Sequence, residues 1–142
     1  RLIFGKRLSK PEYLARYRVA DLFLDTHPYN AGTTASDALR MGLPVLTYLG
    51  SSAVSREAAS VINAVNLPEL ITTNQEQYES LAIELATNPE KLKIIKDKLV
   101  SNLSTAPLYN TPLFTRHLES AYSMMYDRYQ RGLDPDHIYV KH

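Results

Sequence analysis

The chain of 142 residues is 44% hydrophobic and 22% charged, and its formal net charge is +1. This length allows one domain with a modest core, and such an even balance of charge does not indicate a nucleic-acid partner. The sequence contains no cysteine, which excludes disulfides and thiolate chemistry, and no apolar run long enough to cross a bilayer, so we expect a cytoplasmic protein without a membrane partner.

The apolar residues 2–4 at the start of the chain predict a β-strand. A strand of a parallel sheet needs neighbouring strands and the crossover connections that lead to them. No such elements precede residues 2–4 in this sequence. We therefore expect the chain to be the C-terminal piece of a longer protein.

The next helix is expected to begin at Ser9, because a serine followed by a proline and a glutamate in the first turn forms a capping box. The helix should run to about residue 18. Lys10, Tyr13 and Arg16 recur at steps of three along it and therefore share one face. That face is either a solvated surface with an aromatic anchor or part of a binding site.

Residues 20–50 predict a strand, a loop, a helix and a second strand, which together form a parallel βαβ unit. The first strand cannot continue through the loop, because Pro28 lacks an N–H group and Gly32 favours a turn. In order, the expected elements are a strand at 21–25, a loop at 27–32 in which His27 packs, Thr33 and Thr34 at the helix N-cap, a helix at 35–41 that Gly42 ends, and a strand at 44–48.

The start of this helix is a candidate phosphate site. Ligands of open α/β sheets bind beyond the carboxyl ends of the strands, where a helix N-terminus offers free N–H groups and the positive end of its dipole. Gly32 would let a ligand approach the backbone, and the hydroxyls of Thr33 and Thr34 would add donors. Asp37 could reach the hydroxyls of a ribose. In the alternative interpretation, Thr34 and Asp37 form a capping box that only fixes the start of the helix.

The rest of the chain predicts mainly helices. Arg56 follows the second strand, where it either contacts a phosphate or acceptor or holds the loop in place. The last helix is apolar on more than one face, which favours burial against another body of protein. We expect a helix at 55–65, a short strand within 66–71, a helix to residue 87 capped by Thr73 and Glu76, a helix opened by Asn88 with Leu92, Ile95 and Leu99 inward, and a helix at 113–131 opened by Asn110.

Several enzyme classes lose their main support in the sequence. The chain lacks the motifs GxGxxG, GxxxxGK[ST], HExxH and GxSxG, which argues against dinucleotide oxidoreductases, P-loop ATPases, zincins and serine hydrolases. Asp25 ends a strand but has no identifiable carboxylate partner of the glycosidase kind. The sequence also shows no repeat period.

Two segments near the middle of the chain form a recognisable pattern, PYNAGTTASDAL at 28–39 and GLPVLT at 42–47. They resemble the donor-binding core of the O-GlcNAc transferase family, most closely its bacterial members linked to tetratricopeptide repeats, and also its SPINDLY-like relatives. The likeness continues at Gly50 and at residues 55–60, 67–71, 107–111 and 135–137.

The resemblance implies an α/β fold that is the C-terminal part of a Rossmann-like (GT-B type) domain, with a parallel sheet and a long C-terminal helix. A partial nucleotide-sugar-binding domain is expected at residues 1–105, and a C-terminal crossing helix and tail at residues 106–142.

The resemblance also implies a nucleotide-sugar site with no metal and no cofactor besides the donor. In this resemblance, Lys10 matches a lysine at the ribose and phosphate, and Arg16 matches an arginine near the base. Tyr13 replaces a histidine that stacks on the base, and tyrosine can stack as histidine does. The glycine and the two threonines would carry the diphosphate, with the aspartate near the ribose. The implied donor-binding residues are Lys10, Tyr13, Arg16, Gly32, Thr33, Thr34 and Asp37.

The implied activity is transfer of a sugar from a nucleoside diphosphate to Ser or Thr hydroxyls of a protein acceptor. The family's catalytic residues and the tetratricopeptide repeats would lie upstream, so we expect no catalytic residue in this chain and no activity of the chain alone. Animal members carry histidine at the position of Gly32, whereas SPINDLY-like O-fucosyltransferases, which use GDP-fucose, carry glycine. Those fucosyltransferases have a glutamate at the position of Asp37, so Asp37 favours UDP-GlcNAc as the donor. The alternatives are a GDP-fucose-dependent protein O-fucosyltransferase and a non-catalytic nucleotide-sensing or scaffold module.

Overall fold

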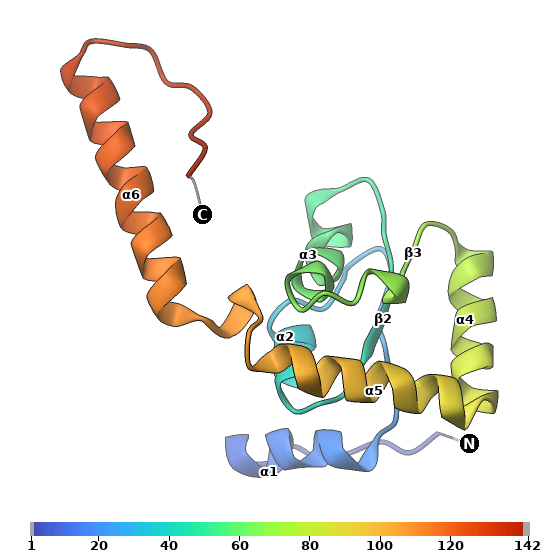
Figure 1. Ribbon diagram of the computed structural model, residues 1–142. Helices are drawn as coiled ribbons and strands as arrows, with labels where there is room; N and C mark the ends of the chain where they lie inside the picture. Colours follow the sequence, from blue (N-terminus) through green and yellow to red (C-terminus); the bar gives the residue numbers. More distant parts are fainter. Residues whose placement is uncertain (1, 141–142) are drawn as a thin grey trace. The chain divides into compact units, whose positions relative to one another are not determined.

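The computed structural model describes residues 2–140, and the chain divides into two compact units, one up to Ala106 and one from Pro107. The first unit contains a three-stranded sheet with helices around it, and the second contains one long helix and a tail (Figure 1). In chain order the elements are α1 (Lys10–Arg16), β1 (Phe23–Leu24), α2 (Thr33–Arg40), β2 (Val45–Tyr48), α3 (Glu57–Ala64), β3 (Ile71–Thr72), α4 (Gln75–Thr87), α5 (Pro89–Leu103) and α6 (Thr111–Gln130), with 3₁₀ turns at Tyr17–Val19, Ala53–Ser55, Pro68–Leu70 and Pro107–Tyr109.

The three strands are parallel and lie in the order β1-β2-β3. Phe23 pairs with Val45 in the first ladder, and Thr47 pairs with Ile71 in the second. Both crossovers run in the same direction along the sheet, and parallel crossovers are right-handed, so α2 and α3 cover one face. The helix α4 packs against β2 and β3 on the other side (Figure 1). The predicted βαβ unit and the predicted α/β class are confirmed.

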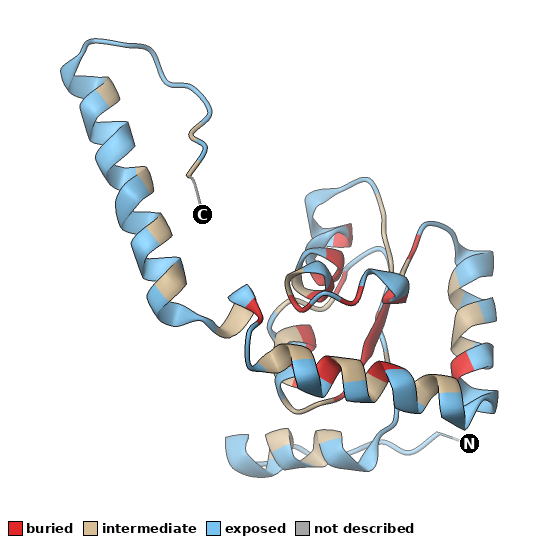
Figure 2. Ribbon diagram, viewed as in Figure 1, coloured by how far each residue is buried: buried red, intermediate tan, exposed pale blue. Residues whose placement is uncertain are grey.

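The core is organised around β2, whose first three residues are buried. A strand with residues of both orientations buried is typical of a parallel sheet that is covered on both faces. Ala38 of α2 and Ala58 of α3 are fully buried, and their small side chains let both helices approach the sheet closely. Figure 2 shows the buried residues in red along β2 and on the inward sides of the surrounding helices.

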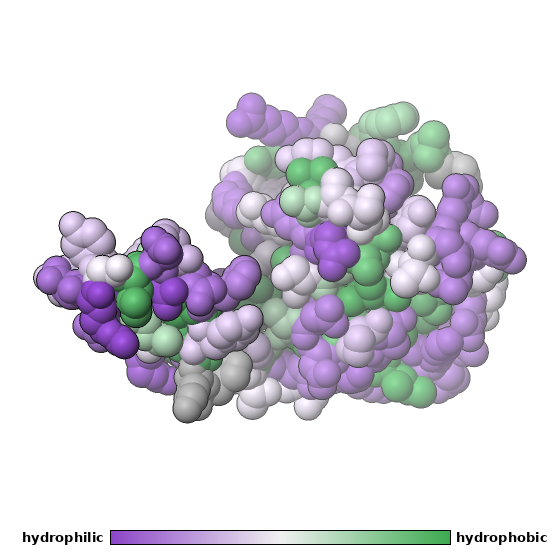
Figure 3. Space-filling view, turned by 90° about the horizontal axis from the view of Figure 1, so that it is seen from above, coloured by the Kyte–Doolittle hydropathy of each residue, from purple (hydrophilic) through white to green (hydrophobic). Residues whose placement is uncertain are grey.

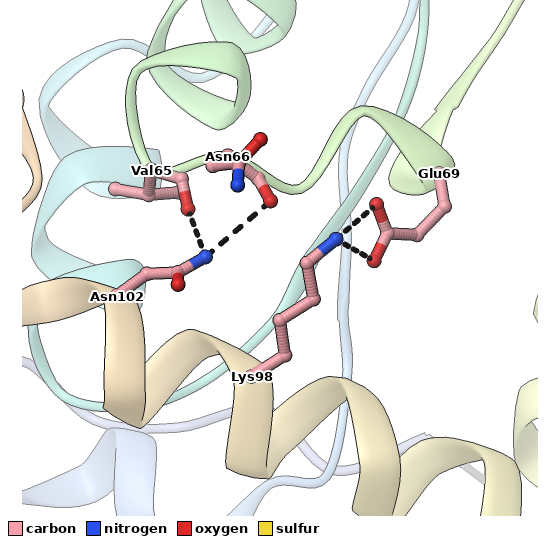
Figure 4. A network of polar contacts seen from close by, with 5 residues as sticks. All are labelled: Val65, Asn66, Glu69, Lys98 and Asn102. Carbon is pink, nitrogen blue, oxygen red and sulfur yellow. Dashed lines mark hydrogen bonds and ion pairs between the residues drawn. The ribbon is translucent and has the colours of Figure 1, made fainter.

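Two polar contacts fasten α5 to the connection between α3 and β3 (Figure 4). The Nδ2 of Asn102 donates to the carbonyl of Val65 at 2.9 Å, next to Asn66, whose φ of 57° lies in the left-handed region. The Nζ of Lys98 lies 2.7 Å from Oε1 and 3.0 Å from Oε2 of Glu69. The helix α5 therefore holds the turn that leads into β3.

Three of the predicted helix starts are confirmed by capping contacts. The carboxylate of Glu12 accepts from the N–H of Ser9 at 3.1 Å and from its hydroxyl at 2.6 Å, which fixes the start of α1. The side-chain oxygens of Asn88 and Asn110 each accept from a backbone N–H three residues later, as expected for the N-caps of α5 and α6.

Two predictions of local structure away from the start of α2 are wrong. Residues 2–4 form no strand and have exposed fractions of 86%, 96% and 90%, because a strand persists only beside a neighbour that satisfies its backbone, and the described sheet pairs β1 with β2 rather than with this segment. The cap of α4 is Asn74, which accepts from the N–H of Gln77 at 2.8 Å. Thr73 instead bonds the side chain of Gln77.

The second unit consists of α6 and the tail that follows it. Arg128 ties the tail to the helix, since its Nε donates to the carbonyl of Asp134 and its Nη2 lies 3.4 Å from Oδ2 of Asp136. Large apolar side chains of α6 lie at the surface; apolar residues are drawn in green among hydrophilic residues in purple in Figure 3. Within residues 2–140, no helix has the length and apolar character needed to cross a membrane.

Candidate functional site

The carboxylate of Asp25 shapes the loop between β1 and α2. Its Oδ1 accepts from the N–H groups of Thr26 and Ala31, each at 2.8 Å, and its Oδ2 accepts from the hydroxyl of Thr47 at 2.6 Å. Asp25 is 7% exposed, so these bonds form in an environment with little competing water. In the sequence, Asp25 is recognisable only as a carboxylate without an identifiable partner. Its position at the end of a strand was the available signal, but its partners could not be read from spacing.

Further contacts pack the same loop against the sheet and α4. The hydroxyl of Tyr78 donates to the carbonyl of Asp25 at 2.8 Å. Burial raises the pKa of the Tyr78 hydroxyl, and the nearby charge of Asp25 raises it further. The ring of His27 stacks on that of Tyr48, with centroids 4.1 Å apart and an interplanar angle of 17°. His27 is thus an exposed loop residue whose ring packs on Tyr48 at the end of β2, in line with the predicted packed loop histidine.

The helix α2 begins at Thr33, with Gly32 as its N-cap. The expected start at residue 35, with Thr33 and Thr34 as caps, is therefore wrong by two residues. The physical reason is the Asp25 contact to Ala31, which fixes the backbone just before Gly32. As a result, Thr33 and Thr34 lie in the first turn, where N–H groups have no partner within the helix. Both residues are exposed, and their hydroxyls make no hydrogen bond with any residue from 2 to 140.

The structure brings Lys10 and Asp37 together near the start of α2. The Nζ of Lys10 lies 2.6 Å from Oδ2 of Asp37, and the exposed fractions of the two side chains are 62% and 20%. The alternative capping box of Thr34 and Asp37 is not formed, because the helix starts at Thr33 and the carboxylate of Asp37 faces Lys10 instead. A ligand that binds Asp37 therefore has to break only one exposed ion pair, and such a pair contributes little to stability.

Two tyrosines of the α1 region join this helix to the start of α2. The rings of Tyr13 and Tyr17 meet edge to face with centroids 5.2 Å apart, and their hydroxyls are hydrogen-bonded to each other. The hydroxyl of Tyr17 also donates to the carbonyl of Thr34 at 3.3 Å. Burial raises the pKa of Tyr17, and the bond to Tyr13 adds to this effect. The ammonium of Lys10 lies 5.1 Å from the ring centre of Tyr13. Tyr17 is not among the site residues predicted from the sequence.

Arg16 is not brought to the start of α2. Its Nη2 donates to the carbonyl of Lys6 at 3.2 Å. Together with Tyr13, it lines a cavity of about 400 Å³ that also contacts Phe23 and Leu24 of β1. The shared face predicted for α1 therefore divides into a part at Asp37 and a part beside this cavity.

Arg56 does not hold its loop through a carbonyl or carboxylate. Its side chain is exposed and makes no hydrogen bond or ion pair within the described residues. It lines a cavity of about 550 Å³ with His27 and Ser52, between the loops that follow β1 and β2. Arg56 is thus a cation at the carboxyl edge of the sheet whose guanidinium is open to contact.

Comparison with known proteins supports one family for this chain. The model of the family described as "Glycosyl transferase family 41" matches residues 1–118. The chain is 31% identical over 138 residues to the UDP-N-acetylglucosamine--peptide N-acetylglucosaminyltransferase of Caenorhabditis elegans, a match that covers 97% of this chain and 12% of that protein. It is 34% identical over 124 residues to the probable UDP-N-acetylglucosamine--peptide N-acetylglucosaminyltransferase SPINDLY of Hordeum vulgare, covering 87% of this chain and 13% of that protein.

A solved structure agrees with these sequence matches. A mutant of the Thermobaculum terrenum O-GlcNAc transferase aligns with a TM-score of 0.81 and 32% identity, over 88% of this chain and 24% of that chain. The chain thus spans only a small part of the proteins it matches. The predicted GT-B type fold, with a parallel sheet and a long last helix, is confirmed. This chain belongs to glycosyl transferase family 41.

Proposed function

We propose that this chain binds the donor of a glycosyltransferase that moves GlcNAc from UDP-GlcNAc to Ser or Thr hydroxyls of a protein acceptor. One observation carries the proposal: the Lys10–Asp37 pair lies near the exposed Thr33 and Thr34 of the first turn of α2, at the carboxyl edge of a parallel sheet. This is the place at which α/β sheets bind ligands. The names of the matched relatives support UDP-GlcNAc and a peptide acceptor.

Each part of the site suits one part of the donor. The first-turn N–H groups of α2 and the hydroxyls of Thr33 and Thr34 would bind the diphosphate, and they would stabilise the charge that develops on it as it leaves. Lys10 would neutralise part of that charge. Asp37 would accept from the ribose hydroxyls, and the ring of Tyr13 would stack on the base.

The proposed activity belongs to a whole protein of which this chain is one part. The chain spans 12% and 13% of the two relatives described above. We propose that the catalytic residues, the acceptor site and a tetratricopeptide array lie in other segments. The isolated chain should therefore transfer no sugar, and sugar transfer by the purified chain at the rate of the intact protein would contradict this.

The site can be tested by titrating the intact protein with UDP in a calorimeter. Asp37→Asn and Thr34→Ala should each weaken UDP binding by about ten-fold, or about 1.4 kcal/mol, with an unchanged circular dichroism spectrum. Asp97→Asn is the matched control, because Asp97 forms a similar exposed ion pair with Lys93 on α5. Unchanged UDP affinity in Asp37→Asn would contradict the assignment of the site. Binding of GDP ten-fold tighter than UDP would contradict the donor.

A further inference from the structure

The side chain of Glu57 lies at the N-terminus of α2, although Glu57 belongs to the first turn of α3. A Cβ atom placed on Gly32 would lie 2.0 Å from Oε1 and 2.6 Å from Cδ of Glu57. The carboxylate therefore occupies the space that a side chain at position 32 would fill. The absence of a side chain at Gly32 is what admits this carboxylate to the start of α2.

The electrostatics of this position favour an anion. The N-terminus of α2 carries the positive end of the helix dipole, and the neighbouring cation Lys10 is already paired with Asp37. The carboxylate of Glu57 makes no hydrogen bond or ion pair within residues 2–140. It is also exposed. The dipole of α2 attracts the carboxylate of Glu57, but no specific partner holds it. The side chain can therefore rotate away at low cost in free energy.

We propose that Glu57 is an internal competitor for the nucleotide diphosphate. This inference rests on the proposed function, because the diphosphate is assigned there to the same turn of α2. In the free protein, the carboxylate of Glu57 lies where phosphate oxygens would approach Gly32. Like charges at such short range repel each other, so the carboxylate must swing away when a nucleotide binds. Glu57 thereby lowers the affinity for the donor, and also for the nucleoside diphosphate that remains after transfer, whose release it favours.

The test compares UDP with uridine, which has the same base and ribose but no phosphate. In the intact protein at low salt, Glu57→Gln should bind UDP about five-fold more tightly than the parent and should bind uridine equally. Because the effect is one of charge at an exposed site, the gain should shrink at high salt. Glu90→Gln is the matched control, since Glu90 is also an acidic residue in the first turn of a helix, α5, and it should change neither affinity.

Three outcomes would overturn the inference while UDP still binds: unchanged UDP affinity in Glu57→Gln, weaker UDP binding, or an equal gain for uridine. Weaker binding would mean that the carboxylate contacts the nucleotide favourably. An equal gain for uridine would mean that the substitution acts through packing and not through charge. If neither the parent nor the variant binds UDP, the proposed function itself fails and this inference fails with it.

Discussion

Replacing Asp25 should loosen the loop that leads into α2. In Asp25→Ala, two backbone N–H groups and the hydroxyl of Thr47 lose their acceptor in a position that is 7% exposed. A hydrogen bond to a charged acceptor contributes about 1.5–3 kcal/mol, and water that enters the gap recovers part of the loss, so we expect a total cost of about 3–5 kcal/mol. Asp25→Asn keeps the shape and one acceptor oxygen, and should cost about 1–2 kcal/mol.

Amide hydrogen exchange in the intact protein measures this effect where it should occur. A protein with several domains does not unfold in a single two-state step, so local exchange is a better measure than a melting temperature. Exchange should accelerate at residues 26–34 in Asp25→Ala, and less so in Asp25→Asn. UDP affinity should fall in parallel, although Asp25 is not among the proposed ligand contacts.

Thr47→Val provides the control, because it removes one hydrogen bond to Asp25 and leaves the two backbone bonds in place. It should cost about 1.5–3 kcal/mol, less than Asp25→Ala. If residues 26–34 exchange equally fast in the parent and in Asp25→Ala, the carboxylate does not hold the loop, and this reasoning is refuted.

Three further predictions concern stability and its dependence on pH. Tyr78→Phe removes the hydrogen bond to the Asp25 carbonyl and should cost about 1 kcal/mol. Because the pKa of Tyr78 is raised on folding, the contribution of this hydroxyl to stability is complete below pH about 10 and is lost above that. The exchange rates of the variant at residues 26–34 should therefore depend less on alkaline pH than those of the parent. Glu12 has a lowered pKa through its bonds from Ser9, so α1 should lose protection from exchange as the pH falls below about 4.3, and Glu12→Gln should remove this dependence. Asn102→Ala leaves the carbonyl of Val65 without its donor and should cost about 1 kcal/mol, measured as faster exchange at residues 65–72 than in the surface variant Glu90→Gln.

The features that could be predicted from the sequence are those that depend on residues close together in the chain. The capping box of Ser9, the Asn88 cap and the order strand, helix, strand across residues 20–50 follow from local propensities and turn chemistry. The strand expected at residues 2–4 failed because a strand depends on a partner elsewhere, and an apolar run does not show whether that partner exists.

The start of α2 was misplaced for the same reason. Spacing alone made Thr34 and Asp37 a plausible capping box, but Asp25, six residues before Ala31, fixes the backbone ahead of Gly32. The pairing of Asp37 with Lys10 joins residues 27 positions apart, so only the family resemblance pointed to it. The place of Glu57 beside Gly32 also depends on how two helices meet, and no pattern in the sequence indicates it.

The attachment of α1 predicts that residues 2–16 respond to a ligand bound at the proposed site. No residue of α1 is buried, and the helix is fastened to α2 through Lys10 and Asp37, with Tyr17 and Thr34 adding a second link just after it. A ligand that binds both Lys10 and Asp37 would break the ion pair between them. The two side chains would then be connected only through their contacts with the ligand. Occupancy and the docking of α1 are then linked equilibria, and any fraction of undocked α1 weakens the apparent affinity in proportion. A change in the rate of tryptic cleavage at the exposed Lys6 would report nucleotide binding without any measurement of catalysis.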